Sequence, residues 1–227
     1  MTRITKAPDE RRGELINAAQ VLFFSKGYEK TSINDIVKAV GVAKGLFYYY
    51  FDSKQAILEA LVANMTGQIV MLVTKVIETP NLSAVEKWEQ MYEISSAWKA
   101  ARKDELLTII RVIMHADNVR LRHAMIKRQH AMVAPLYAKM IAQGVEEGVF
   151  NTPFVEDSAE IILAIYESSR NFLSDILLNP HNYPNGRELV AQKLHAMQTA
   201  VERVLGAAPG TLSTPLIADK RIDTWFS

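Results

Sequence analysis

The chain has no cysteine among its 227 residues. Disulfide frameworks, zinc–thiolate sites and cysteine nucleophiles are therefore excluded, and the absence fits a reducing compartment. Charge of one sign does not predominate either, because the formal net charge is only +1. A surface that binds nucleic acid must therefore come from a local arrangement of charges rather than from the chain as a whole.

Long apolar runs are also scarce. The longest ones, such as LLTIIRVIM, are short and are interrupted by Thr108 and Arg111. We expect none to reach the roughly 18 residues of a membrane span. The charged beginning, MTRITKAPDERRGEL, has no apolar core of a signal peptide. The sequence therefore predicts a cytoplasmic protein with no membrane partner.

Motifs of catalysis or metal binding are missing as well. His123 and His130 stand seven residues apart on one predicted helix, which is too far for one metal ion without an intervening ligand. The sequence has no H-E-x-x-H, no G-x-S-x-G and no glycine-rich phosphate loop. We expect no enzymatic activity, no cofactor and no metal site.

Helical periodicity is present along almost the whole chain. Apolar residues at helical spacing predict a first helix from Asp9 to Lys26, which Gly27 ends. The segment TSINDIVKAVG predicts a second helix of about two turns, capped by Thr31 or Ser32 and ended by Gly41. The helical pattern then resumes at once. A short helix, a glycine turn and another short helix form a helix-turn-helix.

A long helix follows, which we expect Asp52 to cap and Pro80 to close. Strand patterns are essentially absent after it, and further amphipathic helices continue the chain. We predict an all-α fold in which a three-helix helix-turn-helix domain at 1–52 is joined by the long helix to a larger helical domain at 53–205. The remaining residues, 206–227, are predicted to form an irregular tail.

The segment KGLFYYYF, residues 44–51, lines up five aromatic side chains behind a lysine and a glycine. On a helix with 100° per residue, Phe47 and either Tyr50 or Phe51 face the two preceding helices. These side chains are therefore expected to hold the helix against its neighbours.

The opposite face of this helix carries different chemistry. Lys44 and Tyr48 are four residues apart and share it, and Tyr49 lies beside them. Gly45 leaves the beginning of the helix without a side chain, so another backbone can approach. A cation, two phenols and a bare turn suit a phosphate backbone and base edges in a major groove. The alternative is that the tyrosines pack in a core or partner interface of a helical adaptor protein without specific DNA binding.

The stretch AAQVLFFSKGYEKTSINDIVKAVGVAKGLFYYYFDSKQAIL, within residues 11–60, resembles the DNA-binding domain of the TetR family of bacterial transcriptional regulators. The family pattern has F-x-x-x-G-Y/F, then T-S/T, D-I-A, A-G-V-S-K-G-T-L-Y-x-Y-F and S-K-E. The positions that match are Phe23, Gly27, Tyr28, Thr31, Ser32, Asp35, Ile36, Gly41, Val42, Lys44, Gly45, Tyr48, Tyr50, Phe51, Ser53 and Lys54.

The resemblance implies a role for individual residues. The recognition helix would present its outer residues to DNA, Lys54 would meet a phosphate, and the turn before the second helix would anchor the backbone from the other side. The implied DNA-binding residues are Tyr28, Thr31, Ser32, Lys44, Gly45, Leu46, Tyr48, Tyr49 and Lys54.

Two positions depart from the family pattern. Leu46 stands where the family often has a threonine that can contact DNA, and it offers only apolar contact, for instance with a thymine methyl group. Tyr49 stands where the family often has histidine, so the base preference need not match that of relatives. Basic residues before the domain add minor-groove or phosphate contacts, or else form a solvated charged end. These are Arg3, Lys6, Arg11 and Arg12.

For the larger domain, the resemblance implies binding of a small molecule and dimerisation. The last two helices carry apolar stripes, which either form a four-helix bundle between two subunits or fold back on their own domain. Two polar residues in the first of these helices are either pocket groups or, as we favour, an interface salt bridge. The expected dimer interface is Glu167, Arg170, Val190, Leu194, Met197 and Val201.

Pocket residues are sought among large apolar or soft side chains, which are also common in plain cores. Arg111, within TIIRVIM, either points inward and pairs with an anionic ligand or extends outward. The expected ligand-binding residues are Trp88, Met91, Tyr92, Trp98, Arg111, Met114, Tyr137 and Tyr166, with Met125, Met132 and Phe172 as further candidates.

Together these features predict a ligand-responsive transcriptional regulator. We expect a homodimeric repressor that binds a palindromic double-stranded DNA operator and is released by a small, largely hydrophobic effector. Activation rather than repression stays open from the sequence, as do the effector, the operator and the regulated genes.

Overall fold

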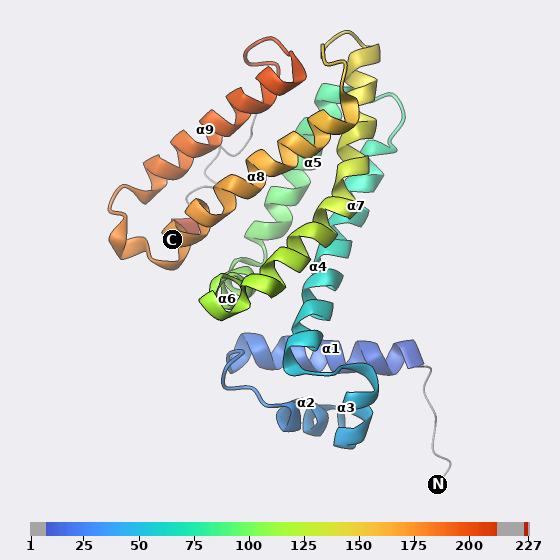
Figure 1. The fold of residues 1–227 in the computed structure, drawn as a ribbon, viewed down its shortest axis with the longest axis vertical. Coiled ribbons are helices and arrows are strands. Elements are labelled where there is room, and N and C mark those ends of the chain that lie inside the picture. Colours follow the sequence, from blue (N-terminus) through green and yellow to red (C-terminus); the bar gives the residue numbers. More distant parts are fainter. Residues whose placement is uncertain (1–7, 213–224, 227) are drawn as a thin grey trace.

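The computed structural model describes residues 8–212 and 225–226, and this part of the chain is helical and contains no strand (Figure 1). The predicted all-α fold is therefore confirmed. Arg3 and Lys6 lie outside the described residues, as does most of the predicted tail. The helices are α1 (Pro8–Ser25), α2 (Ile33–Val40), α3 (Lys44–Tyr50), α4 (Lys54–Ile77), α5 (Ala84–Ala100), α6 (Lys103–Met114), α7 (Val119–Glu146), α8 (Val155–Leu178) and α9 (Gly186–Leu205), with short 3-10 turns at Ala116–Asn118 and Pro180–Asn182.

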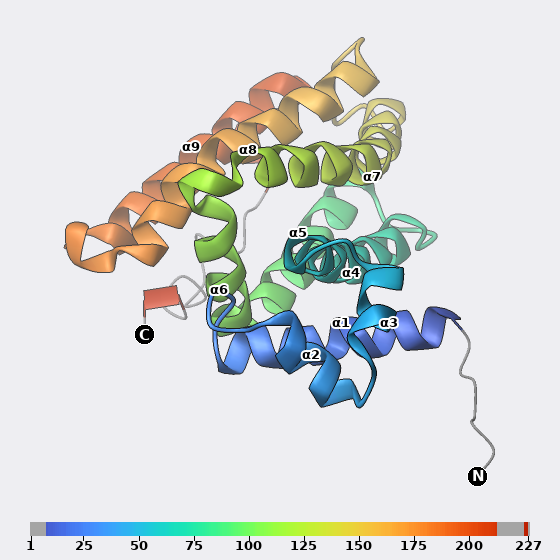
Figure 2. The same ribbon diagram turned by 60° about the horizontal axis from the view of Figure 1, so that its bottom comes forward.

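Helices α1, α2 and α3 gather at one end of the molecule, where α4 begins (Figure 2). Of the two predicted caps of α2, Ser32 is the one that accepts a hydrogen bond from a helical backbone N–H. Gly41 ends α2 with a φ of 72°, a left-handed conformation that glycine adopts without steric penalty. Because α3 starts only three residues later, the two short helices form a helix-turn-helix.

Helix α4 leads from this end into the body of the molecule (Figure 1). Its N-cap is Ser53, whose hydroxyl accepts from the Ala56 N–H at 3.0 Å, so the expectation that Asp52 caps it is wrong by one residue. By length and hydropathy α4 is also a candidate membrane span, so the expectation that no stretch reaches that length is wrong too. The core helix of a globular protein passes the same test, and α4 packs against α1, α5 and α7.

Two hydrophobic cores lie along α4. Ile57, Leu58 and Leu61 belong to a core that α1, α2 and α3 share, and Ile109 of α6 joins the same cluster. Val73 and Ile77 belong to a second core, built with α5, α7, α8 and α9. The first core therefore crosses the predicted domain boundary at residue 52.

The chain after α9 folds back on that helix as far as residue 212. Glu202 is buried and accepts hydrogen bonds from the backbone N–H groups of Gly210 (3.1 Å) and Leu212 (3.0 Å). Phe226 packs against the cluster of Leu194 and Met197. The described parts of the predicted tail are thus anchored to the larger domain.

Candidate nucleic-acid interface and effector site

Helix α3 separates its aromatic residues into a buried and an exposed set. Phe47 is fully buried and Phe51 is 4% exposed, whereas Tyr48 and Tyr49 are 48% and 74% exposed. Tyr50 is half-buried against the same core. The packing role predicted for Phe47 and Phe51 is therefore confirmed, and two phenols project into solvent from a helix that is firmly held from behind.

The beginning of α3 has space for another molecule. Lys44 is exposed, and its Nζ lies 5.9 Å from the centroid of the Tyr48 ring. A Cβ atom added at Gly45 would meet nothing within 4 Å. The fold itself therefore does not require glycine here, although glycine destabilises a helix by roughly 1 kcal/mol relative to alanine. Leu46, also predicted to contact DNA, is half-buried.

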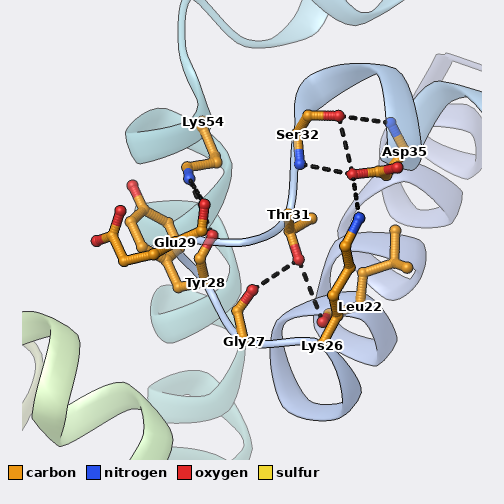
Figure 3. Close-up of polar contacts among 9 residues, drawn as sticks. All are labelled: Leu22, Lys26, Gly27, Tyr28, Glu29, Thr31, Ser32, Asp35 and Lys54. Atoms are coloured by element: carbon orange, nitrogen blue, oxygen red, sulfur yellow. Dashed lines mark hydrogen bonds and ion pairs between the residues drawn. The ribbon is translucent and has the colours of Figure 1, made fainter.

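The turn that leads into α2 is fixed by a compact hydrogen-bond network (Figure 3). The Asp35 carboxylate accepts from the Ser32 N–H (2.8 Å), the Ser32 hydroxyl (2.8 Å) and Lys26 Nζ (2.7 Å). The Lys26 hydrogen bond and then those of Ser32 hold the pKa of the Asp35 carboxyl well below its usual value. The ionised Asp35 side chain therefore connects the beginning of α2 to Lys26, directly after α1, through its hydrogen bonds.

Thr31 lies on the buried side of this turn. Its side chain is 1% exposed, and its hydroxyl donates to the carbonyl oxygen of Gly27 at 2.8 Å and to that of Leu22 at 3.3 Å (Figure 3). This burial leaves the hydroxyl no surface for the backbone contact expected of it. Ser32 is exposed and keeps that possibility.

Lys54 begins α4 and reaches back across the same turn (Figure 3). Its Nζ donates to the carbonyl oxygen of Tyr28 at 2.9 Å and lies 4.2 Å from the centroid of the Tyr28 ring. Because these contacts occupy part of the ammonium group, Lys54 connects α4 to the helix-turn-helix. A phosphate contact, as predicted from the resemblance, can use only the remaining N–H bonds.

Other cations surround this surface. Lys30 and Lys38 are exposed near α2. The two arginines at the beginning of α1 have partners within the chain, because Arg11 pairs with Glu14 at 2.6 Å and Arg12 lies over the Phe51 ring. Among the described residues, exposed positive charge near this surface therefore lies at Lys30, Lys38 and Lys44, and also at Arg12, whose contact with a ring leaves its charge in place.

The interior of the larger domain brings three of the predicted pocket tyrosines together. Tyr92, Tyr137 and Tyr166 come from α5, α7 and α8, and burial raises the pKa of each phenol, to about 12 for Tyr92. Trp88 stands edge-on to Tyr137 at 5.4 Å between ring centroids. Trp88, Tyr92 and Tyr166 also line a small cavity beside α9, with a volume of about 10 Å³.

A larger cavity of about 140 Å³ lies between α4 and α7. The sequence pattern singled out Met125 and Met132 of its lining as candidates, but gave no signal for its α4 side. Its walls are formed by Glu59, Val62, Ala63, Thr66, Ala124, Met125, Arg128, Gln129 and Met132. This cavity adjoins the helix that carries the helix-turn-helix.

The other four predicted ligand-binding residues are spread over the larger domain. Met91 is buried in the second core and Trp98 in the first, where the Arg102 guanidinium stacks on its ring at 4.5 Å. Arg111 is exposed, so its outward alternative holds, and Met114 is half-buried near Arg122. Met91 shares its core with Tyr137 and Trp88, whereas Trp98, Arg111 and Met114 lie away from the tyrosines.

Three of the residues predicted for the dimer interface are buried within their own subunit, and the others contact neighbouring helices. Leu194, Met197 and Val201 are buried there, and Val190 packs beside them. Arg170 donates to the Gln129 side chain of α7 at 3.2 Å, and the Glu167 carboxylate lies 3.6 Å from Nε2 of His130 on the same helix. Leu194, Met197 and Val201 are therefore covered within one subunit, whereas Glu167, Arg170 and Val190 remain partly exposed.

Within residues 8–212 and 225–226, no three His, Cys, Asp or Glu side chains gather as metal ligands would.

Two protein-family models match the chain. The model of the bacterial regulatory proteins of the tetR family matches residues 15–61, which contain α2 and α3. The model of the tetracyclin repressor-like C-terminal domain matches residues 102–200. The family's DNA-binding domain is therefore matched in the N-terminal part of the chain, and its C-terminal domain in the part that follows.

Characterised and uncharacterised regulators resemble parts of the chain. An uncharacterised HTH-type transcriptional regulator of Lactococcus lactis is 45% identical over 51 residues, or 22% of this chain. The match spans about a quarter of that relative, 26% of its length. The HTH-type transcriptional repressor KstR2 of Mycobacterium tuberculosis is 21% identical over 155 residues, covering 66% of this chain and 74% of the repressor.

Solved structures share the fold over most of the chain. A TetR-family regulator from Pectobacterium atrosepticum has a TM-score of 0.63 at 17% identity, covering 87% of this chain and 95% of that one. Thermus thermophilus FadR, a TetR-family repressor solved with lauroyl-CoA, has a TM-score of 0.56 at 24% identity, with coverages of 88% and 98%. The two family models together match 146 of the 227 residues, and they show that the chain belongs to the TetR family of bacterial transcriptional regulators.

Proposed function

We propose that this protein is a homodimeric transcriptional repressor whose two α3 helices enter successive major grooves of a palindromic operator. The observation that carries the proposal is the exposed face of α3, where Lys44, Gly45, Tyr48 and Tyr49 are backed by the fully buried Phe47. Exposed aromatic side chains often mark a binding surface, and a binding surface needs side chains held rigidly from behind, as the buried Phe47 holds these. As a member of a family of regulators, the protein is assigned no enzymatic activity, and we place its work in the cytoplasm.

Individual residues take distinct roles in this proposal. Lys44 and Ser32 bind phosphates, Tyr49 reaches base edges, and Gly45 lets the DNA backbone come close. Lys54 and Tyr28 chiefly keep the turn in place, as their mutual contacts indicate. This assignment changes the roles implied by the family resemblance for Lys54 and Tyr28, because these residues already contact each other.

For the dimer, we propose the outer face of α8 and α9 in place of the inward-facing set. Ile161, Ala164 and Ser168 are exposed along α8 at helical spacing, and Ala196 is exposed on α9. Small side chains allow two helix pairs to approach closely in a four-helix bundle. A two-fold dimer presents two equivalent readers, which is why the operator should be close to palindromic.

Effector control follows from the position of α4. A small molecule held between α4, α5, α7 and α8 shifts α4 and changes the separation of the two readers. The solved complex of FadR with lauroyl-CoA supports a small-molecule effector in a protein of the same fold. The effector must bind the DNA-free conformation more tightly than the DNA-bound one, because only differential affinity moves the equilibrium.

The decisive experiment is selection of binding sites from random duplex DNA by the purified chain, followed by affinity measurements at two salt concentrations. We expect a palindrome and a steep salt dependence, because Lys and Arg contacts release counterions from the phosphates. Tyr49→Ala should change the relative preference among bases. Recovery of no enriched sequence by the wild-type chain, with cell extract present to supply any co-repressor, would favour the adaptor alternative.

The dimer interface is tested separately by Ile161→Arg. Sedimentation should show the wild type as a dimer and the variant as a monomer, since a charge cannot be accommodated between packed apolar helices. Arg203→Glu, an exposed change near the end of α9, is the matched control and should leave the dimer intact. A dimeric Ile161→Arg variant would place the interface elsewhere.

A further inference from the structure

The segment that follows α9, residues 206–212, turns back onto that helix, and we call it the strap. Its turn is closed by the Thr211 N–H, which donates to the carbonyl oxygen of Ala208 at 3.1 Å. Gly210 has a φ of 81° in this turn, a left-handed conformation that glycine adopts without steric penalty. The turn brings Leu212 into the second core, where its side chain is 2% exposed.

Leu212 fills apolar space between α5, α8 and α9. It is one wall of the cavity of about 10 Å³ beside α9. A space of this size holds about one water molecule, so no organic ligand fits there while Leu212 is in place. Loss of a buried leucine side chain leaves a far larger apolar cavity, of the kind that binds small aromatic molecules. The other walls are Trp88, Tyr92, Tyr166, Leu194, Met197, Gln198 and Val201.

Two side chains of α9, one turn apart, hold the backbone of the strap. The buried Glu202 carboxylate accepts hydrogen bonds from the N–H groups of Gly210 (3.1 Å) and Leu212 (3.0 Å). The Gln198 carboxamide donates to the carbonyl oxygen of Leu212, and more distantly to Glu202 at 3.4 Å. In the described part of the chain, no Lys, Arg or His side chain forms an ion pair with Glu202. The strap therefore supplies most of the donors that this carboxylate needs.

These contacts define what could replace the strap. If it leaves, Glu202 loses two N–H donors and Gln198 loses its carbonyl acceptor. A buried carboxylate without donors is unfavourable, so the exchange requires a molecule that donates an N–H and offers a carbonyl oxygen. The space of Leu212 requires an apolar group beside them. A secondary amide with apolar substituents combines these three features.

The same core connects the strap to α4. Val73 and Ile77, near the far end of α4, belong to the core that Leu212 joins. Helix α4 runs from this core to the helix-turn-helix (Figure 1). Replacement of Leu212 by another molecule therefore acts on the core that holds one end of α4.

We propose that the effector site lies beneath the strap, where Leu212 now occupies it, and that the effector is an apolar secondary amide which displaces Leu212 and takes over its hydrogen bonds with Gln198 and Glu202. This inference rests on the proposed function, because it names the class of molecule that the regulator senses. It goes beyond a largely hydrophobic effector by requiring an amide and by giving the chain its own competitor for the site.

The first experiment tests whether Leu212 closes the site. The neutral fluorophore N-phenyl-1-naphthylamine is titrated into the full chain and its variants, with circular dichroism to confirm folding. Leu212→Asp should bind the probe at least about tenfold more tightly than the wild type, because a carboxylate is not accommodated in the apolar site and the strap leaves. Gly210→Ala, which strains the turn, should bind it about threefold more tightly. Ala208→Asp adds the same charge at an exposed position of the strap and should match the wild type.

A double variant tests where the probe binds. Gln198 lines the cavity and is partly exposed, so a larger ring at this position reaches the space that Leu212 leaves. Adding Gln198→Trp to Leu212→Asp should therefore return the probe affinity to within about twofold of the wild-type value. A double variant that keeps the full increase would place the probe elsewhere and overturn the proposal.

The second experiment tests the chemical class of the ligand. N-benzylhexanamide and benzyl hexanoate have nearly the same shape, but the ester has no N–H to donate. Calorimetric titration into the wild-type chain should show the amide binding about tenfold more tightly, because the ester leaves the Glu202 carboxylate without that donor. In Glu202→Met the two affinities should agree within about twofold, since the acceptor is gone.

Three further results would overturn the proposal. They are a Leu212→Asp variant that binds the probe no more tightly than the wild type, equal wild-type affinities for amide and ester, and a preference for the amide that survives in Glu202→Met. None of these titrations contains DNA, so their failure is distinguishable from failure of the proposed function. If an operator is selected but the titrations fail, only the effector site and class are wrong. If no operator is selected, the proposed function fails whatever the titrations show.

Discussion

The protein uses tyrosine in two opposite ways. On α3, Tyr48 and Tyr49 project into solvent from a helix whose other side is anchored in the first core. In the larger domain, Tyr92, Tyr137 and Tyr166 come from three helices and are enclosed by protein, which raises the pKa of each phenol. The same side chain is therefore exposed to solvent in one region and enclosed by protein in the other. Whether a tyrosine ring is exposed or enclosed therefore depends on how the surrounding helices pack, not on the residue type.

The largest expected effect tests the buried residue that holds α3 against the core behind Tyr48 and Tyr49. Phe47→Ala removes a fully buried ring behind the exposed tyrosines, and the free energy of unfolding should fall by about 3–5 kcal/mol. Chemical denaturation followed by circular dichroism measures this loss. Tyr49→Ala, at a 74% exposed site of the same helix, should stay within about 1 kcal/mol of the wild type. Comparable losses in both variants would contradict the separation of the two faces.

The enclosure of the interior tyrosines should be measurable as a loss of stability in alkaline solution. The pKa of Tyr92 is raised to about 12 in the folded chain from an ordinary value near 10, so the folded state holds this proton more tightly than the unfolded state. Its contribution to stability is complete below about pH 10 and is lost as the pH rises towards 12. Tyr92→Phe should reduce the loss by about 2 kcal/mol, measured by denaturation at several pH values. An unchanged slope would mean that the phenol is not enclosed.

A substitution at Gly45, in the first turn of α3, tests DNA binding separately from stability. Gly45→Ala should leave the free energy of unfolding unchanged or raise it by up to about 1 kcal/mol, because a Cβ atom there meets nothing in the free chain. Affinity for the selected operator should nevertheless fall by about tenfold, or 1.4 kcal/mol. Fluorescence anisotropy measures the affinity. Gly67→Ala, at a helical glycine of α4 with equal free space, is the control and should not affect DNA binding.

The smallest effect concerns the link between the regions. Lys54→Ala removes the hydrogen bond to the Tyr28 carbonyl and should lower the free energy of unfolding by about 1 kcal/mol. If Lys54 also meets a phosphate, the slope of log affinity against log salt should flatten by about one unit. Lys30→Ala, an exposed change without the carbonyl contact, should leave the stability within about 0.5 kcal/mol. A stability loss without a change of salt slope would assign Lys54 a purely positioning role.

The N-terminal part of the fold could be predicted well because its signals are local. Gly41 and the Ser32–Asp35 pair define the ends of α2 by backbone conformation and capping, which depend on few neighbours. Periodicity then sorted Phe47 from Tyr48. The cap of α4 was misplaced by one residue because Asp52 and Ser53 both have side chains that can cap, and only tertiary geometry decides between them.

The larger domain could be predicted only in outline. Periodicity shows which residues share a helix face but not whether that face meets solvent, a partner or an internal space. Leu194 and Met197 were assigned to a subunit interface although the subunit's own core covers them. Arg111, for which the sequence left an inward and an outward orientation open, is exposed. Such assignments depend on the packing of four helices, which no local pattern encodes.

Helix α4 begins in one core and ends in the other, and Lys54 ties its first turn to the helix-turn-helix. Its 24 residues give it a length of about 36 Å. A tilt of about 5° at its far end would therefore displace the reading helix by about 3 Å, close to the 3.4 Å rise of one base pair. Under the proposed function, α4 would therefore convert a small rotation in the larger domain into a displacement of α3 of about one base-pair step.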